Sequence, residues 1–189
     1  VINTSYSDAV IPWLKSAGKA YPDFGSGNIN HLIPRIQFAA AEKYGIEDYW
    51  NIKVTYATGH FHDVVISKEG QTEQVSQLID LRDEGRKLEP DLEQIFAACK
   101  IAMPTDAKRN MMNASSNFEI IQGILAAVRE GRKIKLHCPG VFGEPGGYPV
   151  IIDGSGSRIK AYIDDTYFDV ESMRCKNRES LYLDGIESV

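Results

Sequence analysis

The sequence predicts an α+β fold, in which helices pack on a mixed or antiparallel sheet of about six strands. Three observations lead to this class. Segments in which apolar and polar residues alternate, typical of strands, are interspersed with segments of helical apolar spacing. Several strand segments are linked by short turns, which favours hairpins. The 189 residues, 43% hydrophobic and 25% charged, suffice for one large domain with a core, or for one domain plus the remnant of another.

The first thirty residues differ from the rest of the chain. Residues 1–5 are expected to form a short buried strand, and a helix capped by Ser7 or Asp8 follows at once and ends at Gly18. A strand that runs straight into a helix, with no initiator Met before it, is typical of a chain that starts inside an α/β domain. We therefore interpret residues 1–30 as the tail end of a parallel-sheet unit with a linker, and residues 31–189 as an α+β domain.

The remaining elements follow from apolar spacing and turn residues. The apolar residues from Ile29 to Tyr44 recur at helical spacing, and Gly45 ends that helix. The longest helix is expected at 115–130, with Asn113 or Ser115 as its cap, and one of its faces carries Phe118, Ile121, Ile124, Leu125 and Val128. Further helices are expected at 90–99 and 169–182, and strands at 52–56, 61–67, 78–81, 134–138, 148–153 and 158–163.

Composition excludes several classes of function. The net charge is -5 and the basic residues are scattered, which argues against a nucleic-acid partner because phosphate binding needs clustered Lys and Arg. No apolar run approaches the roughly 20 residues that a membrane span needs. The three cysteines, Cys99, Cys138 and Cys175, have no C-x-x-C spacing. We expect them to be reduced, mostly buried thiols in a cytoplasmic protein.

Two histidines in the segment after the first long strand are the first candidates for chemistry. His60 and His62 are two residues apart, so on a strand they share a face. Such a pair could bind one metal ion or exchange protons near neutral pH. No third ligand follows at a recognised spacing, so we assign no metal site. An ordinary hydrogen-bonded histidine in a sheet is the alternative interpretation.

A glycine- and proline-rich loop at 137–149 is the second candidate. It carries His137, Glu144 and Tyr148 between two predicted strands. Glycines allow a backbone to approach a ligand closely, so this loop could form a wall of an active site. The sequence has no GK[ST] motif and no helix begins directly after the loop, so it is not a phosphate loop. A structural crossover is the alternative.

Two further segments could hold an anionic group. The glycine loop Gly25–Asn28 precedes a helix, and backbone N–H groups at a helix N-terminus favour anions. Asn28 is therefore a candidate for substrate binding, although a turn with an Asn cap would leave the same pattern. Arg109 could bind a carboxylate through two hydrogen bonds, or it could be one of a solvated basic pair with Lys108.

Taken together, these motifs resemble the later part of two-domain NAD(P)-dependent oxidoreductases, loosely those of the saccharopine- and opine-dehydrogenase-like group. The resemblance spans nearly the whole chain. It depends on five blocks, which are Val1–Tyr6, Gly25–Asn28 with Leu32 and Pro34, His60–His62, His137 with Gly146–Val150, and Asp184–Glu187.

The resemblance implies that a Rossmann domain precedes this chain and binds most of an NAD or NADP cofactor. Residues 1–30 would then be Rossmann-like, and residues 31–189 would be a substrate and dimerisation domain of a homodimer. The end of the first strand, at Asn3, Thr4 and Ser5, would touch the nicotinamide side of the cofactor. The sequence itself lacks a G-x-G-x-x-G unit, so this chain alone should not hold a dinucleotide tightly.

The leading hypothesis is therefore a fragment of an NAD(P)-dependent dehydrogenase that acts on a small amino- or hydroxy-acid-like substrate. His60 or His62 would act as the acid or base, and His137 and Tyr148 would line the pocket. Asn28, Arg109 and Glu144 would contact the substrate. One alternative is a metal-dependent hydrolase or lyase that uses His60 and His62 with an acid such as Asp63 or Glu144. Another is a non-catalytic domain that self-associates.

Overall fold

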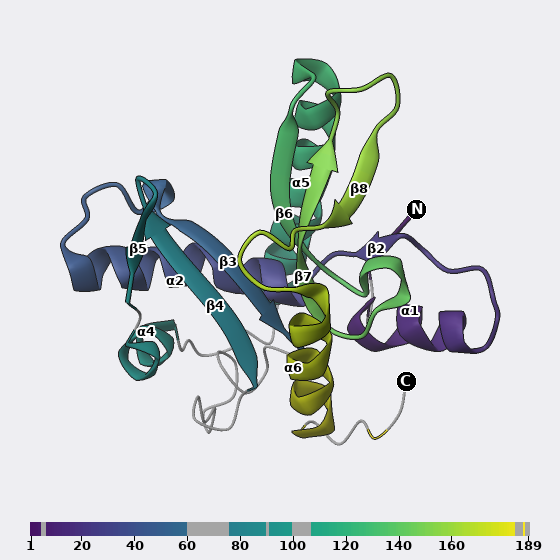
Figure 1. The fold of residues 1–189 in the computed structure, drawn as a ribbon, viewed down its shortest axis with the longest axis horizontal. Coiled ribbons are helices and arrows are strands. Elements are labelled where there is room, and N and C mark those ends of the chain that lie inside the picture. Colours follow the sequence, from purple (N-terminus) through teal and green to yellow (C-terminus); the bar gives the residue numbers. More distant parts are fainter. Residues whose placement is uncertain (5–6, 60–75, 90, 100–106, 184–186, 188–189) are drawn as a thin grey trace.

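The computed structural model describes residues 1–4, 7–59, 76–89, 91–99, 107–183 and 187 (Figure 1). It confirms the α+β class, with a six-stranded sheet in which every strand pairing is antiparallel. Five strands follow the order β5-β4-β3-β7-β6, and β8 pairs with β7. The strands are β1 Ile2–Asn3, β2 Phe24–Gly25, β3 Lys53–Thr58, β4 Gln77–Asp83, β5 Arg86–Leu88, β6 Lys133–Pro139, β7 Gly147–Asp153 and β8 Lys160–Ile163. The helices are α1 Ser7–Ser16, α2 Asn28–Tyr44, α4 Leu92–Cys99, α5 Ala107–Glu130 and α6 Val170–Leu183.

The six-stranded sheet consists of two halves that diverge from one point (Figure 1). The strands β5, β4 and β3 form one half, and β6, β7 and β8 form the other. One register pair, Thr58 with Gly147, joins β3 to β7. The hydrophobic core divides in the same way, because one cluster of buried residues lies among α2, α4 and β3–β5, and a second lies mainly among α5, α6 and β6–β8.

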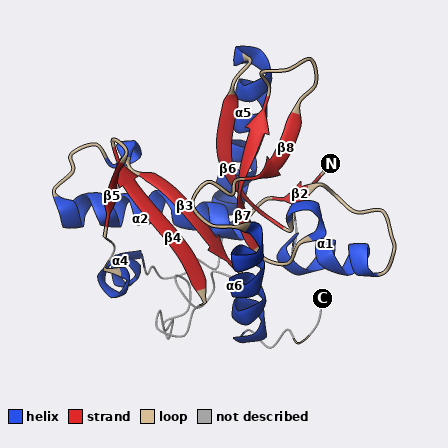
Figure 2. Ribbon diagram, viewed as in Figure 1, coloured by secondary structure: helices blue, strands red, loops and turns tan. Residues whose placement is uncertain are grey.

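The N-terminal segment forms a small unit of its own beside this sheet (Figure 2). Strands β1 and β2 pair in parallel, and α1 connects them. A parallel strand–helix–strand unit is what the predicted α/β remnant requires, although β2 falls in a segment expected to be a loop. With two residues, β2 is too short to produce a periodic pattern. The division at residue 30 stays a prediction.

Helix α5 begins earlier than predicted, and it does not bury most of the apolar face that its sequence shows. It begins at Ala107, so neither Asn113 nor Ser115 caps it. The residues that it buries are Ser116, Ile120, Gly123 and Ala127, whereas Phe118, Ile121, Leu125 and Val128 are exposed. A Cβ at Gly123 would lie 2.7 Å from the Leu136 side chain, so the narrow face of the helix lies directly on β6. Close packing on the small residues thus leaves the larger ones outside.

The strand expected to be buried at 1–5 is shorter and less buried, since β1 covers Ile2–Asn3, both half-buried, and Val1 and Thr4 are exposed. The remaining predicted elements agree with the structure to within a few residues, with two qualifications. Strand β5 was not expected, and it follows a tight turn in which Glu84 and Gly85 both have positive φ. The predicted strand at 61–67 lies outside the described residues. Cys99 and Cys138 are buried free thiols as expected, but Cys175 is exposed. No helix in the described part of the chain is long and apolar enough to cross a membrane.

Candidate functional site

Four elements converge around Gly147, at the point where the two halves of the sheet meet. Gly147 pairs with Thr58 at the end of β3. A Cβ at Gly147 would lie 2.7 Å from Cδ1 of Ile29, in the first turn of α2. The carbonyl of Gly147 also accepts a hydrogen bond of 3.0 Å from Nδ2 of Asn177 on α6. The end of β3, the start of β7 and the N-terminus of α2 are therefore held together here, with α6 alongside.

A polar cluster lies between the β2–α2 junction and α5, next to this point. Gly27 precedes α2 with φ 126°, a conformation that favours glycine, and no side chain caps the helix. Instead, Oγ of the buried Ser116 accepts a hydrogen bond of 3.0 Å from the Gly27 N–H and donates one of 3.2 Å to the Gly27 carbonyl. The Ser26 hydroxyl donates to Oδ1 of Asn117. Two side chains of α5 thus fix the loop that starts α2.

Asn30, which is buried, and Glu119, which is exposed, complete the cluster. Nδ2 of Asn30 donates a long hydrogen bond of 3.5 Å to Oε2 of Glu119. Oδ1 of Asn30 is buried and has no hydrogen-bond partner among the described residues. Desolvation raises the pKa of Glu119 above its ordinary value, and the hydrogen bond from Asn30 only partly offsets this. We call Ser26, Gly27, Asn30, Ser116, Asn117 and Glu119 the α2–α5 cluster.

The end of β1 adjoins this cluster. The Asn3 carbonyl accepts a hydrogen bond of 2.9 Å from the Ser26 N–H, and Asn3 pairs with Gly25. Thr4 follows and is exposed. Ser5 lies outside the residues that the structure describes. The segment assigned to cofactor contact therefore starts beside the α2–α5 cluster.

Tyr148, the residue after Gly147 on β7, is fully buried. Burial raises the pKa of its hydroxyl, with the Asn177 amide acting in the opposite direction. The hydroxyl oxygen of Tyr148 and Oδ1 of Asn177 are both buried without a hydrogen bond of good geometry to the described residues. Nδ2 of Asn177 is occupied, since it donates to the carbonyls of Pro145 and Gly147.

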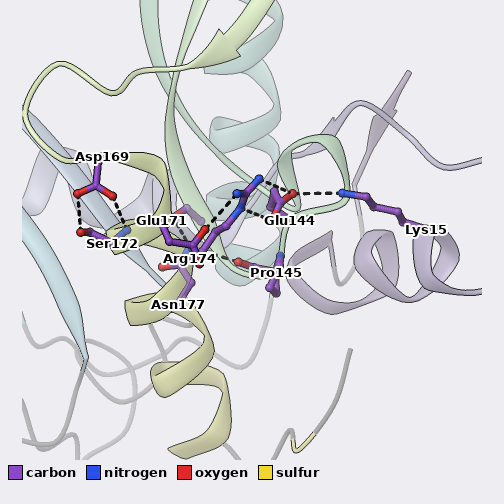
Figure 3. A network of polar contacts seen from close by, with 9 residues as sticks. Lys15, Glu144, Pro145, Asp169, Glu171, Ser172, Arg174 and Asn177 are labelled. Atoms are coloured by element: carbon purple, nitrogen blue, oxygen red, sulfur yellow. Dashed lines mark hydrogen bonds and ion pairs between the residues drawn. The ribbon is translucent and has the colours of Figure 1, made fainter.

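Glu144 is bound to other protein groups (Figure 3). Its two carboxylate oxygens accept hydrogen bonds of 2.8 and 3.0 Å from Arg174, and Lys15 donates one of 3.2 Å. Burial raises the pKa of Glu144, but these hydrogen bonds and positive charges outweigh it and hold the pKa below its ordinary value. The network ties α1 and α6 to the loop before β7. A groove of about 480 Å³ opens beside it, and its lining includes Lys15, Glu144, Arg174 and Arg178.

His137 is buried within the sheet and its Nε2 accepts a hydrogen bond of 3.2 Å from the Tyr56 N–H. Burial, together with the charge of Lys135, lowers the pKa of His137 to about 3, although Asp164 acts in the opposite direction. A neutral imidazole that accepts a backbone N–H links β3 to β6 and is poorly suited to exchange protons with a substrate.

Several of the predicted site residues, or their side chains, lie outside the described part of the structure. His60, His62 and Asp63 lie beyond the described residues, although Gly59 directly before them is packed against α6. Asn28 begins α2 and Arg109 lies in the first turn of α5, but the structure does not describe their side chains. Within the described ranges, no three His, Cys, Asp or Glu side chains come together as a metal ion would require.

Sequence reasoning missed Asn30, Ser116, Asn117 and Glu119. Asn30 follows the glycine loop closely and could have been included with Asn28. Ser116, Asn117 and Glu119 carry no motif, and they lie about 90 residues from the loop that they contact, as the hydrogen bonds record. Only the packing of α5 reveals them.

No protein-family model matches the chain, and no curated protein matches it either. Among solved structures, the malate dehydrogenase from Aeropyrum pernix has a similar fold, with a TM-score of 0.57 and 15% sequence identity. The match covers 98% of this chain and 61% of that one, so the chain spans less than two thirds of the enzyme that it resembles. At this identity the likeness shows the fold alone.

Proposed function

We propose that the chain is the substrate-side part of an NAD(P)-dependent oxidoreductase that acts on a small amino- or hydroxy-acid-like substrate. The observation that carries the proposal is the likeness of nearly the whole chain to a large part of a malate dehydrogenase. The partly unsatisfied α2–α5 cluster supports it, because buried polar groups without partners are uncommon except where a water or ligand completes them. The narrower resemblance to saccharopine- and opine-dehydrogenase-like enzymes stays a prediction from the sequence motifs.

The α2–α5 cluster suits the two ends of such a substrate. The N-terminus of α2, which no side chain caps among the described residues, favours a carboxylate. Oδ1 of Asn30 and the carboxyl group of Glu119 can accept hydrogen bonds from an amino or hydroxyl group. Asn28 and Arg109 are further proposed contacts to the carboxylate. Glu144 is excluded from this role in its present arrangement, because Arg174 and Lys15 already occupy its oxygens.

We assign proton transfer to His60 or His62. Gly59 fixes the backbone directly before this pair, because a Cβ there would lie only 2.3 Å from the Asn177 carbonyl oxygen. Histidine is the side chain whose ordinary pKa best suits acid–base work near neutral pH. His137 does not suit this role, since its pKa is far below that range.

The residues present fit only one end of a dinucleotide. The end of β1, at Asn3 and Thr4, could meet the nicotinamide side beside the α2–α5 cluster. The sequence holds no G-x-G-x-x-G unit that could cradle the pyrophosphate, so a further domain would supply most of the binding. The cofactor would supply hydride transfer, and this chain would orient the substrate and hold the proton.

The test uses the complete protein that contains this chain. We expect it to bind NAD(H) or NADP(H), and to change the absorbance of the reduced nicotinamide with one or more amino or hydroxy acids. His60→Asn and His62→Asn, made singly, are matched variants of the proposed acid–base pair. We expect one of them to lose turnover and the other to keep it. Failure to bind either dinucleotide, or full activity in both variants, would contradict the proposal.

A further inference from the structure

The segment between β8 and α6 contacts both halves of the sheet. After β8 it loops toward the β3–β5 half before it enters α6 (Figure 1). Its first residue, Asp164, is buried, and the Asp164 N–H donates a hydrogen bond of 2.9 Å to the Pro149 carbonyl of β7. Farther along, the guanidinium carbon of Arg82 on β4 lies 4.2 Å from the centroid of the Tyr167 ring. The segment is thus tied to the β6–β8 half at its start and reaches the other half through Tyr167.

Lys135 of β6 lies at the centre of these contacts. Its Nζ forms an ion pair of 2.9 Å with Asp164, and it also donates a hydrogen bond to the Thr55 hydroxyl on β3. The same Nζ lies 5.6 Å from the centroid of the Tyr167 ring. Both distances to this ring are within the roughly 6 Å of a cation–π interaction. The Tyr167 ring therefore contacts one cation from each half of the sheet.

Arg82 is fixed on its own half before the ring stacks on it. Its Nε and Nη2 donate hydrogen bonds of 2.7 and 3.3 Å to the carboxylate of Asp80, which is only 5% exposed. Its Nη1 donates one of 3.3 Å to the Gly85 carbonyl. A guanidinium held in this way has little rotamer freedom left to lose when an aromatic ring packs on it. Tyr167 therefore meets an ordered cation.

The contacts of Tyr167 lie away from the point where the two halves meet. In the register of the sheet, Arg82 lies five residues from the Thr58–Gly147 pair along β3, and Lys135 lies four residues from it along β7. At about 3.3 Å per residue, these separations are about 13 to 17 Å. A contact at that distance resists rotation about the pair, whereas a single register pair can act as a hinge.

Helix α6 also touches both halves, but it does so next to the hinge. Nδ2 of Asn177 donates to the Gly147 carbonyl, and a Cβ at Gly59 would lie 2.3 Å from the Asn177 carbonyl oxygen. These contacts fix where the halves meet. The angle between the halves depends on contacts farther out, of which the Tyr167 stacking is one.

We propose that residues 164–167 are a strap that holds the two halves of the sheet at a fixed angle through the stacking of Tyr167 on Arg82. When the ring is released, the halves rotate about the Thr58–Gly147 pair. The α2–α5 cluster changes with this angle, because α2 packs in the core of the β3–β5 half and α5 in the core of the other half. The strap goes beyond the proposed function and holds whether or not that function is correct.

The first experiment follows amide hydrogen exchange in the complete protein by NMR. The reporter is the Tyr56 N–H, because its acceptor, Nε2 of His137, belongs to the other half. We expect Tyr167→Leu to raise the exchange rate of this amide about tenfold, since the variant removes two cation–π contacts between the halves. The amides of the β6–β7 ladder, which are bonded within one half, should change less.

Two variants serve as controls. Tyr162→Leu removes a ring of similar exposure, 38% against 41% for Tyr167, but the cation beside Tyr162 is Lys133 of the same half. Tyr167→Phe keeps the aromatic ring and therefore the stacking. In both variants the Tyr56 N–H should exchange as in the parent protein.

Two results would overturn the proposal. If Tyr167→Leu left the exchange of the Tyr56 N–H unchanged, the ring would not restrain the two halves. If the variant accelerated the β6–β7 ladder as much as the Tyr56 N–H, Tyr167 would contribute only to overall stability. Neither measurement needs a substrate or a dinucleotide, so a failure of the strap is distinguishable from a failure of the proposed function.

A second experiment measures the separation of the halves directly. In a Cys175→Ser background, which removes the exposed thiol, spin labels at Glu42→Cys on α2 and Arg129→Cys on α5 report the distance between these helices by double electron–electron resonance. Dilution with unlabelled protein restricts the signal to distances within one chain. We expect Tyr167→Leu to broaden the distance distribution and Tyr162→Leu to leave it unchanged. The same distribution in the parent protein and in Tyr167→Leu would contradict the strap.

Discussion

The Glu144 network and the α2–α5 cluster both place a carboxyl group among polar neighbours, but they differ in the number and charge of the protein donors that the carboxyl group receives. Glu144 receives charged donors from Arg174 and Lys15. Glu119 receives one long hydrogen bond from Asn30, whose own Oδ1 has no partner among the described residues. The first arrangement stabilises the contact of three segments, and the second leaves capacity for a ligand. This difference separates a structural carboxylate from a candidate functional one.

Breaking the Glu144 network should have the largest effect on stability. Arg174→Met would leave Glu144, whose side chain is only 14% exposed, with Lys15 as its remaining cation. We expect the free energy of unfolding to fall by about 2 kcal/mol, because a partly buried carboxylate loses two charged hydrogen bonds. Denaturant unfolding measures this. Arg178→Met, an exposed position on the same helix, is the control and should change stability little.

Ser116→Ala tests the satisfied part of the α2–α5 cluster. The variant removes the partner of both the N–H and the carbonyl of Gly27. We expect a loss of about 1 kcal/mol in thermal or chemical unfolding. Ser115→Ala changes the adjacent, exposed serine and should be neutral or slightly stabilising, since Ala has the higher helix propensity. Equal losses in both variants would contradict the assigned role of Ser116.

The two carboxyl groups should give opposite pH dependences. The pKa of Glu144 is lowered from 4.5 in the folded state, so its contribution to stability is present above that pH and lost as the pH falls through the folded value. The pKa of Glu119 is raised from 4.5, so its contribution is present below that pH and lost as the pH rises through the folded value.

Unfolding curves of Glu144→Gln and Glu119→Gln across this pH range measure both contributions. Glu144→Gln should lose less stability on acidification than the parent protein. Glu119→Gln should lose less stability as the pH rises from acid to neutral. If both variants changed the pH dependence of the unfolding free energy in the same direction, the pKa values of Glu144 and Glu119 would be shifted alike, and the proposed difference between the two carboxyl groups would be wrong.

Asn30→Leu should have the smallest effect on stability and a large effect on binding. It removes a buried acceptor that has no partner at the cost of one long hydrogen bond, so we expect a change within about 1 kcal/mol in either direction. Ligand affinity, measured by calorimetry with a substrate found in the activity screen, should fall. A stability loss as large as that of Arg174→Met would mean that Asn30 serves the fold.

Sequence reasoning predicted the elements whose local signals are strong. Helix α2 ends at Gly45 in the left-handed conformation, and the N–H of Gly45 bonds to the Ala41 carbonyl, as a glycine C-cap predicts. Sequence reasoning missed β2 and β5, because two or three residues are too few to show a period. It found the helical spacing in α5 but could not tell which face packs inward, since that depends on how closely Gly123 can approach Leu136.

The candidate site was harder to predict than the fold. Glu144 was singled out because it lies in a glycine-rich loop, yet its partners Arg174 and Lys15 lie 30 and 129 residues away. Glu119 was passed over because a lone acid on a helix carries no motif. Only the tertiary arrangement shows that the charge of Glu144 is neutralised by Arg174 and Lys15, whereas Glu119 contacts the uncharged Asn30.

The two halves of the sheet are joined by only one register pair between described strands, Thr58 with Gly147. Each half has a hydrophobic cluster, although Ala57 of β3 belongs to the cluster of the other half. Apart from the Thr58–Gly147 pair, the described polar links between the strands of the two halves include the hydrogen bond from Tyr56 to His137 and that from Lys135 to Thr55. Amide hydrogen exchange should therefore report two cooperative units with separate opening energies. A small rotation between them would change the separation of the Gly59 end of β3 from the Ser116 turn of α5. The width of the candidate site would then depend on the Thr58–Gly147 pair together with these two hydrogen bonds.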